Sequence, residues 1–152
     1  MKQVDEYNNA RITDSANPMV PTFDNNQSDS QPTIMQVLPA LVQGGVERTS
    51  IEIASAISEA GGRCIIVSAG GPMEHEVVRA RAEHVTLPVD SKNPIVMYLN
   101  VSRLIKIIRD NNVNIVHARS RAPAWSAWLA AKRCNVPFVT TFHGVYSLGG
   151  RL

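Results

Sequence analysis

Short apolar runs alternate with longer amphipathic stretches from Ile34 onward. The runs are rich in β-branched residues, and the run CIIVS at residues 64–68 is too uniformly apolar to have one side in water. Glycine or proline stands between most runs and the stretches that follow them. The pattern predicts five strands, at residues 34–39, 64–68, 84–87, 114–118 and 137–142. It predicts four helices between them, at residues 46–60, 72–82, 93–112 and 123–133.

The helices are predicted from residue spacing and from end signals. In the longest one the apolar residues that share a side are Met97, Val101, Leu104, Ile105 and Ile108. In the first one they are Val46, Ile53, Ile57 and Ala60. The pair Gly61 and Gly62 predicts the end of that first helix. Pro72 and Pro123 each predict a first helical position.

Apolar strands joined by helical connections of crossover length predict a parallel sheet with helices on both faces, a Rossmann-like α/β fold. Ligands of such sheets bind outside the carboxyl ends of the strands. The loops predicted at that edge are residues 39–46, 68–72, 88–93, 117–122 and 142–150.

The composition indicates one folded domain with a polar start. The chain has 152 residues, of which 44% are hydrophobic. Residues 1–33 are rich in Asn, Asp, Ser, Gln and Pro, so we expect a disordered tail there and the domain at residues 34–152. The tail lacks the pattern of a secretory signal, and no later segment is apolar enough to span a bilayer. We expect the protein in the cytoplasm, with peripheral association at the inner membrane.

Charge and cysteine content narrow the class of partners. The net charge is +2, and because the tail is acidic the remainder is more basic than this total. Such a balance suits phosphates or an acidic membrane surface but is too weak to predict nucleic-acid binding. Cys64 and Cys134 have the spacing of neither a metal site nor a disulfide framework, so we expect two inert thiols.

The segment LPALVQGGVER at residues 38–48 predicts an anion site. An apolar strand runs there into Gly44 and Gly45 and then into a helix, whose N-terminal N–H groups and dipole favour negative charge. The alternative is ordinary turn chemistry. The segment has neither the dinucleotide pattern G-x-G-x-x-G nor the phosphate-loop lysine, so a nicotinamide oxidoreductase and a P-loop kinase or ATPase are both disfavoured.

Side chains near two other strand ends are further candidates. His143 directly follows the fifth strand, where an imidazole can bond a sugar hydroxyl or simply cap the strand. Arg119 and Arg121 alternate in the loop after the fourth strand, where their guanidinium groups either bind an anion or are solvated. Trp125 and Trp128 share a helix face, which fits core packing or a patch near a membrane.

These segments together resemble the N-terminal domain of a glycosyltransferase family 4 enzyme with the GT-B fold. The resemblance covers roughly residues 34–147. It is carried by LVQGGVER at 41–48, SAGGP at 68–72, NIVHARSR at 114–121 and VPFVTTFHG at 136–144. HARSRAPAW at 117–125 further resembles bacterial enzymes that build lipopolysaccharide core and related surface glycans, some of them mannosyltransferases.

The resemblance implies a sugar transfer that retains anomeric configuration, with a nucleotide-diphosphate sugar as donor and an anionic glycan or glycolipid as acceptor. It implies that Gly44 and Gly45 approach the donor diphosphate and that His143 contacts the transferred sugar. Arg119 and Arg121 would face the acceptor. No metal and no cofactor is implied.

The sequence ends at Leu152, before the region that holds most of the nucleotide-sugar in this family. We therefore expect a fragment with little or no transferase activity by itself. The alternative is a non-catalytic Rossmann-like module that binds an anionic partner.

Overall fold

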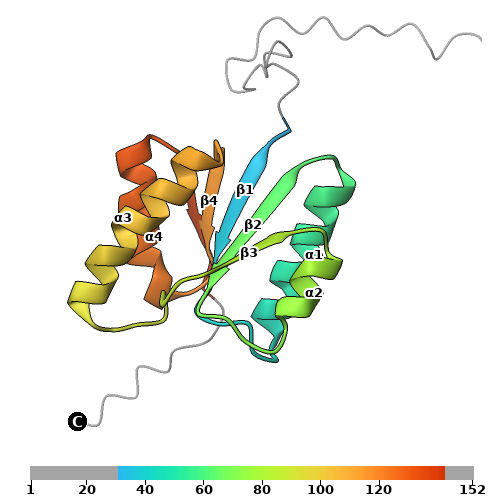
Figure 1. The fold of residues 1–152 in the computed structure, drawn as a ribbon, viewed down its shortest axis with the longest axis horizontal. Helices are drawn as coiled ribbons and strands as arrows, with labels where there is room; N and C mark the ends of the chain where they lie inside the picture. Colours follow the sequence, from blue (N-terminus) through green and yellow to red (C-terminus); the bar gives the residue numbers. More distant parts are fainter. Residues whose placement is uncertain (1–30, 143–152) are drawn as a thin grey trace, which may run out of the picture. The chain divides into compact units, whose positions relative to one another are not determined.

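A computed structural model of the protein describes residues 31–142, which form an α/β domain (Figure 1). The strands are β1 (Thr33–Val37), β2 (Arg63–Ser68), β3 (Glu83–Thr86), β4 (Ile115–Ala118) and β5 (Phe138–Thr140). The helices are α1 (Gly45–Glu59), α2 (Glu74–Arg79), α3 (Pro94–Asp110) and α4 (Arg121–Cys134). The alternation of strands and helices confirms the predicted fold class.

The strands form one parallel sheet in the order β3-β2-β1-β4-β5. β1 lies in the middle, and its Gln36 is in register with Ile66 of β2 and with His117 of β4. β2 and then β3 are added on one side of β1. After the crossover through α3, β4 and then β5 are added on the other side of β1. The strand order therefore reverses between β1 and β4, which makes that boundary the topological switch point of the sheet.

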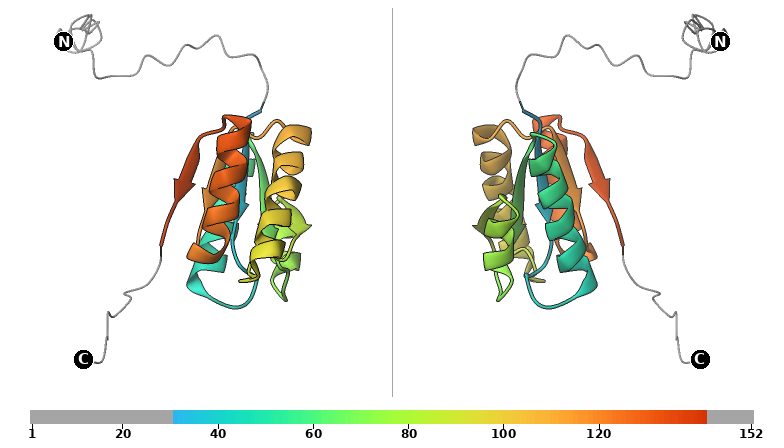
Figure 2. Two further views of the ribbon diagram at one scale, coloured as in Figure 1. Left: turned by 90° about the vertical axis from the view of Figure 1, so that its left-hand side faces the viewer. Right: turned by 90° about the vertical axis from the view of Figure 1, so that its right-hand side faces the viewer.

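Two helical layers cover the sheet, with α1 and α2 on one face and α3 and α4 on the other (Figures 1 and 2). Successive residues of the central strands enter opposite layers, as alternation along a strand requires. Met35 and Val37 pack into the core under α3 and α4, whereas Leu38 packs into the core under α1 and α2. Both faces of β1 and β2 are buried, which explains the uninterrupted apolar run in β2.

The helix faces largely agree with the predicted spacing. Val101, Leu104 and Ile108 of α3 are buried. In α1 the buried apolar residues are Ile51 and Ala54. The predicted face residues Val46, Ile53 and Ile57 are half-buried, and Ala60 is the exposed C-cap. The predicted helix end is confirmed, because Gly61 follows that cap with φ +83°.

Two predicted helix starts were wrong. α2 begins at Glu74, because the N–H of Met73 bonds the carbonyl of Leu41 and holds residues 71–73 in a turn. α4 begins at Arg121, with Pro123 in its first turn, where a missing N–H costs no helical hydrogen bond. Arg121 is therefore the first helical residue and does not lie in the loop.

The predicted tail and His143 lie outside the described residues, apart from residues 31–33. Thr33, placed in the tail by the sequence, is the first residue of β1. Cys64 and Cys134 are both free thiols, at the start of β2 and at the end of α4 as predicted. Within residues 31–142 no helix combines the length and the apolar character needed to cross a bilayer.

Candidate functional site

The switch point between β1 and β4 is flanked by two helix N-termini. Seven residues separate the end of β1 from the start of α1, and two residues separate the end of β4 from the start of α4. Because all strands are parallel, both helices begin at the carboxyl edge of the sheet, one on each face. This is the edge at which open α/β sheets bind their ligands.

The N-terminus of α1 has no side-chain cap. Gly44 is its N-cap, in an extended conformation with φ −172° and ψ 169°, and contributes no side-chain hydrogen bond to the first turn. A Cβ on Gly45 would meet no atom within 4 Å, so this position is open. The first-turn N–H groups and the helix dipole are thus presented without a protein anion from the cap itself.

Glu47 lies against this N-terminus. A Cβ added to Gly44 would stand 2.3 Å from Oε2 of Glu47, so the carboxylate rests beside the bare Cα of Gly44. An acid in the first turn is favourable for the helix by itself. An anionic ligand at Gly44 would have to move this side chain aside. Whether Gly44 and Gly45 bind a phosphate stays a prediction.

The N-terminus of α4 is the second uncapped end. Ser120 is its N-cap with φ −165° and ψ 163°, and its side chain makes no capping hydrogen bond. Arg121 follows as an exposed residue in the first turn, and α4 contains no acidic residue. A basic side chain in a first turn opposes the helix dipole. An anion bound at this end would interact favourably with the first-turn N–H groups that Ser120 does not cap, and with the basic side chain of Arg121.

Arg119 lies between the two helix starts and is buried, with 3% of its surface exposed. Its backbone N–H bonds the carbonyl of Val37 at 2.9 Å, which fixes the residue at the switch point. Its Nη1 donates to Oε1 of Gln36 at 3.4 Å, whereas its Nε is buried with no hydrogen-bond partner in the described part of the chain. Burial lowers the pKa of the guanidinium. The alternative of a solvated arginine is therefore wrong for Arg119.

Gln36 is the residue of this site that the sequence reasoning missed. It is fully buried in β1. Its Nε2 donates to the carbonyl of Ser50 in α1 at 3.0 Å and to Sγ of Cys64 at 3.4 Å. The side chain thus ties α1, β1 and β2 to Arg119 beside β4. The only signal was an amide side chain among the apolar residues that follow Thr33 in the run TIMQV.

The loop after β2 is closed by its own side chains. The N–H groups of Gly70 and Gly71 donate to Ser68 Oγ at 3.0 Å and to Glu74 Oε1 at 2.8 Å. His84 links the same two side chains, with Nε2 2.9 Å from Ser68 Oγ and Nδ1 3.5 Å from Glu74 Oε2. These glycine N–H groups already have partners, so the loop SAGGP offers less to an anion than Gly44 and Gly45 do.

The chain leaves β5 at the same edge of the sheet. The N–H of Thr141 bonds the carbonyl of Ala118 at 3.0 Å, and its Oγ1 lies 3.2 Å from Nε2 of His117. His117 is therefore a half-buried side chain that connects β4 to the end of β5. His143 lies outside the described residues, so its predicted role is untested.

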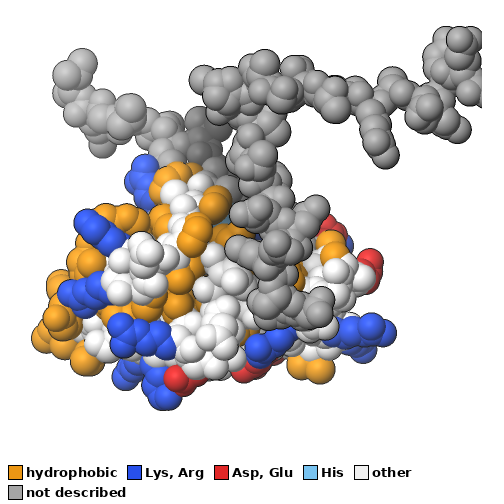
Figure 3. All heavy atoms as spheres, turned by 90° about the horizontal axis from the view of Figure 1, so that it is seen from above, with side chains coloured by type: hydrophobic (Ala, Val, Ile, Leu, Met, Phe, Trp, Pro, Cys, Tyr) orange, Lys and Arg blue, Asp and Glu red, His pale blue; other side chains and the backbone are white. Residues whose placement is uncertain are grey.

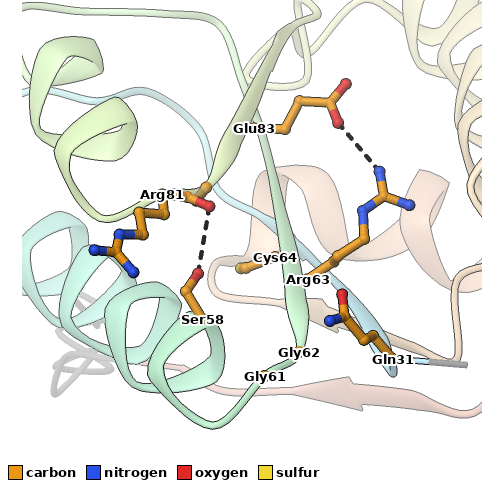
Figure 4. A pocket seen from close by; sticks show the side chains of 9 residues that line it. Gln31, Ser58, Gly61, Gly62, Arg63, Cys64, Arg81 and Glu83 are labelled. Atoms are coloured by element: carbon orange, nitrogen blue, oxygen red, sulfur yellow. Dashed lines mark hydrogen bonds and ion pairs between the residues drawn. The ribbon is translucent and has the colours of Figure 1, made fainter. Parts of the chain in front are cut away.

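A hollow of about 410 Å³ lies at the other edge of the sheet (Figure 4). It lies between the end of α1 and the starts of β2 and β3. Arg63 and Glu83 form an ion pair of 3.6 Å there, and Ser58 Oγ donates to the carbonyl of Arg81 at 3.3 Å. This hollow is at the amino ends of the strands, away from the candidate residues. Among residues 31–142 no three His, Cys, Asp or Glu side chains are grouped so that they could hold a metal ion.

The comparisons with known proteins point to one family. The family profile described as Glycosyltransferase Family 4 matches residues 43–152. The chain is similar to a glycosyltransferase from Rickettsia africae ESF-5, with a TM-score of 0.71 and 48% sequence identity. That match covers 79% of this chain and 32% of the other, so the chain spans about a third of the length of that protein.

More distant structures share the fold alone. MurG from Acinetobacter baumannii matches with a TM-score of 0.57 and 13% identity over 75% of this chain and 37% of its own. A UDP-N-acetylglucosamine 2-epimerase matches with a TM-score of 0.52 and 11% identity over 80% of this chain and 36% of its own. No curated protein matches the chain.

Proposed function

Because the chain belongs to Glycosyltransferase Family 4, we propose that it serves the transfer of a sugar from a nucleotide-diphosphate sugar to an anionic glycan or lipid-linked acceptor. We place this reaction in bacterial surface polysaccharide synthesis, with lipopolysaccharide core as the specific product and with retention of anomeric configuration. The similarity to the Rickettsia glycosyltransferase supports the general activity. The roles of individual residues in this proposal rest on the geometry around the switch point between β1 and β4.

One observation carries the assignment of residues. Two uncapped helix N-termini flank the switch point, and a buried guanidinium with an unpartnered Nε lies between them. Two helix N-termini and one guanidinium at one sheet edge suit a diphosphate and an anionic acceptor once the Glu47 carboxylate has moved aside. In this proposal Gly44 and Gly45 approach the donor diphosphate. His143 contacts the transferred sugar.

We assign different tasks to the two arginines that face the acceptor side. Arg121 is exposed in the first turn of α4, so its planar fork can pair directly with an acceptor carboxylate or phosphate. Arg119 is buried and donates to Gln36, so it supports the site through its charge and through this hydrogen bond. Arg119 is thus a positioning residue in this proposal.

The proposal is tested by titrating the isotope-labelled chain with inorganic pyrophosphate, which stands in both for the donor diphosphate at Gly44 and Gly45 and for an acceptor phosphate at Arg121. We expect the amide resonances of Gly44, Gly45 and Arg121 to shift together. Arg121→Gln should weaken binding about tenfold, the loss expected for a charge-assisted pair. Arg79→Gln, which removes an exposed arginine at the far end of α2, is the matched control and should leave binding unchanged.

Two results would overturn the assignment. One is the absence of shifts at Gly44 and Gly45 at saturating pyrophosphate. The other is an equal loss of binding in Arg79→Gln, which would show attraction by total charge alone. The role of His143 has its own test, because in an enzyme that contains this chain and shows turnover, His143→Ala should lower kcat. Unchanged turnover removes His143 from the site.

A further inference from the structure

The two helical layers of this domain carry opposite charge. α3 and α4 contain six Lys and Arg side chains and a single carboxylate, Asp110, which is paired with Lys106. α1 and α2 contain five Glu side chains and two Arg. In the space-filling view, Lys and Arg side chains alternate with hydrophobic ones on the side of the molecule where α3 and α4 lie (Figure 3). The sheet therefore separates a basic layer from an acidic one.

The basic layer also exposes large apolar side chains on its outer surface. Ile95 and Tyr98 of α3 are 70% and 56% exposed, and Leu99 beside them is also exposed. Trp125 and Trp128 of α4 are 44% and 43% exposed, which excludes the core-packing alternative for them. The two helices lie side by side on the same face of the sheet (Figure 2). We call the outer side of these two helices the α3–α4 surface.

The exposed residues lie on regular stripes. On α4 the residues Arg121, Trp125, Trp128 and Lys132 follow one another at spacings of four, three and four. The Nζ of Lys132 lies 5.2 Å from the centroid of the Trp128 ring, a cation–π contact. The inner stripes already fill the core, through Val101, Leu104 and Ile108 of α3 and through Ala127, Ala130 and Ala131 of α4. The outer stripes are thus not needed for folding.

Aromatic residues next to basic side chains on a helix surface suit an anionic bilayer. Trp and Tyr prefer the headgroup level, Ile and Leu reach the acyl boundary, and Lys and Arg meet lipid phosphates. Nucleic acid would pair with the cations but would gain nothing from exposed Ile95 and Leu99. Protein interfaces place few Lys side chains in their core. The composition of the α3–α4 surface therefore favours lipid.

We infer that the α3–α4 surface docks this domain on a membrane that contains anionic lipids. Ile95, Tyr98, Leu99 and Trp125 lie in the first halves of their helices, and both helices begin at the carboxyl edge of the sheet. Insertion of these side chains turns the carboxyl edge of the sheet toward the bilayer, whereas Lys106 and Arg109 contact lipid headgroups from the second half of α3. The orientation gives a lipid-linked acceptor a short path to Arg121. That last step rests on the proposed function, but the docking itself does not.

The chain contains its own probe for this docking. Its two tryptophans are Trp125 and Trp128, so intrinsic fluorescence reports on the α3–α4 surface alone. Full-length chain is mixed with vesicles of phosphatidylcholine, or of phosphatidylcholine with about one third phosphatidylglycerol. We expect co-sedimentation and a blue shift of the emission with the anionic vesicles, and release as salt is added.

Variants separate the charge from the apolar contribution. Arg103→Gln and Lys106→Gln should each weaken binding about fivefold, the effect of one charge near an anionic surface. Ile95→Ser with Leu99→Ser should abolish the blue shift while circular dichroism stays native, because both side chains are exposed. The matched controls lie on the acidic layer, where Val78 is 70% exposed, and Val78→Ser and Arg79→Gln should leave binding unchanged.

The inference fails if anionic vesicles cause neither sedimentation nor a blue shift, if neutral vesicles bind equally well, or if the control variants lose as much affinity as the test variants. Vesicle binding without pyrophosphate binding at Gly44 and Gly45 would support the docking and overturn the proposed function. Pyrophosphate binding without vesicle binding would support the proposed function and overturn the docking.

Discussion

Arg119 and Gln36 are 83 positions apart in the chain, yet Nη1 of the arginine donates to the amide oxygen of the glutamine inside the sheet at 3.4 Å. The contact exists because β1 pairs with β4 and places the carboxyl ends of both strands side by side. Gln36 in turn donates to the carbonyl of Ser50 in α1. One buried amide thus connects both sides of the switch point.

Replacing Gln36 should leave the buried guanidinium of Arg119 with no side-chain acceptor among residues 31–142. We expect Gln36→Leu to lower the free energy of unfolding by about 2 kcal/mol, because a buried charge loses its hydrogen bond. Arg119→Met should cost less, since it removes the charge itself. In the double variant the two losses should not add, with a coupling of about 1 kcal/mol measured by urea unfolding. Additive losses would show that the contact contributes nothing to stability.

Gly71 should tolerate no side chain. It has φ +148°, and a Cβ there would stand 2.4 Å from the carbonyl oxygen of Leu41, a backbone atom that cannot rotate away. We expect Gly71→Ala to lower the free energy of unfolding by about 3 kcal/mol.

Gly45→Ala is the matched control for that substitution, because its Cβ would meet nothing within 4 Å and the position is helical. It should raise stability by about 0.5 kcal/mol. Equal urea midpoints for the two variants would contradict the geometry.

The fold was predictable because each of its parts is encoded locally. The continuous apolar run of β2 indicates a strand buried on both faces, and the spacing of Val101, Leu104 and Ile108 indicates which side of α3 faces the sheet. The end of α1 follows from Gly61. Strands and crossovers of these lengths leave few topologies, so the sheet followed from the elements.

The site was predictable only in part. Gly44 and Gly45 were identified from a local strand–glycine–helix pattern, and the structure places them at a helix start. The burial of Arg119 was not predictable, because it depends on the register between β1 and β4. The same holds for the arrangement of Ser68, His84 and Glu74, which join three consecutive elements through side chains whose directions no sequence pattern specifies.

The two cysteines should differ in reactivity. Burial raises the pKa of the Cys64 thiol, whereas Cys134 lies half-buried at the end of α4. Because the thiolate is the reactive form, Cys134 should react with iodoacetamide before Cys64 in the native chain. Mass spectrometry of tryptic peptides over a time course measures both rates. The reverse order would contradict the burial of Cys64.

The raised pKa of Cys64 also fixes a pH dependence. Its thiol binds its proton more tightly in the folded state than in the unfolded state. The contribution to stability is therefore complete below the pKa of the unfolded thiol and is lost as pH rises toward the folded value. The free energy of unfolding of the chain relative to that of Cys64→Ala, measured by urea unfolding, should fall across that range. A difference that grows with pH would contradict the sign.

The side chains Ser68, His84 and Glu74 have the order of a hydrolase triad, but their geometry is structural. Ser68 is fully buried, and its hydroxyl accepts the N–H of Gly70, so no substrate can reach it. These three side chains hold the turn at residues 69–73.

His84→Ala should therefore lower the free energy of unfolding by about 1–2 kcal/mol and speed hydrogen exchange at Gly70 and Gly71. His75→Ala is the control, because that histidine is exposed and contacts the neighbouring carbonyl of Pro72, and it should change both quantities far less. Slow exchange at both glycines in His84→Ala would show that the turn holds without the histidine, and the loop after β2 would then owe its shape to Gly71 and Leu41 alone.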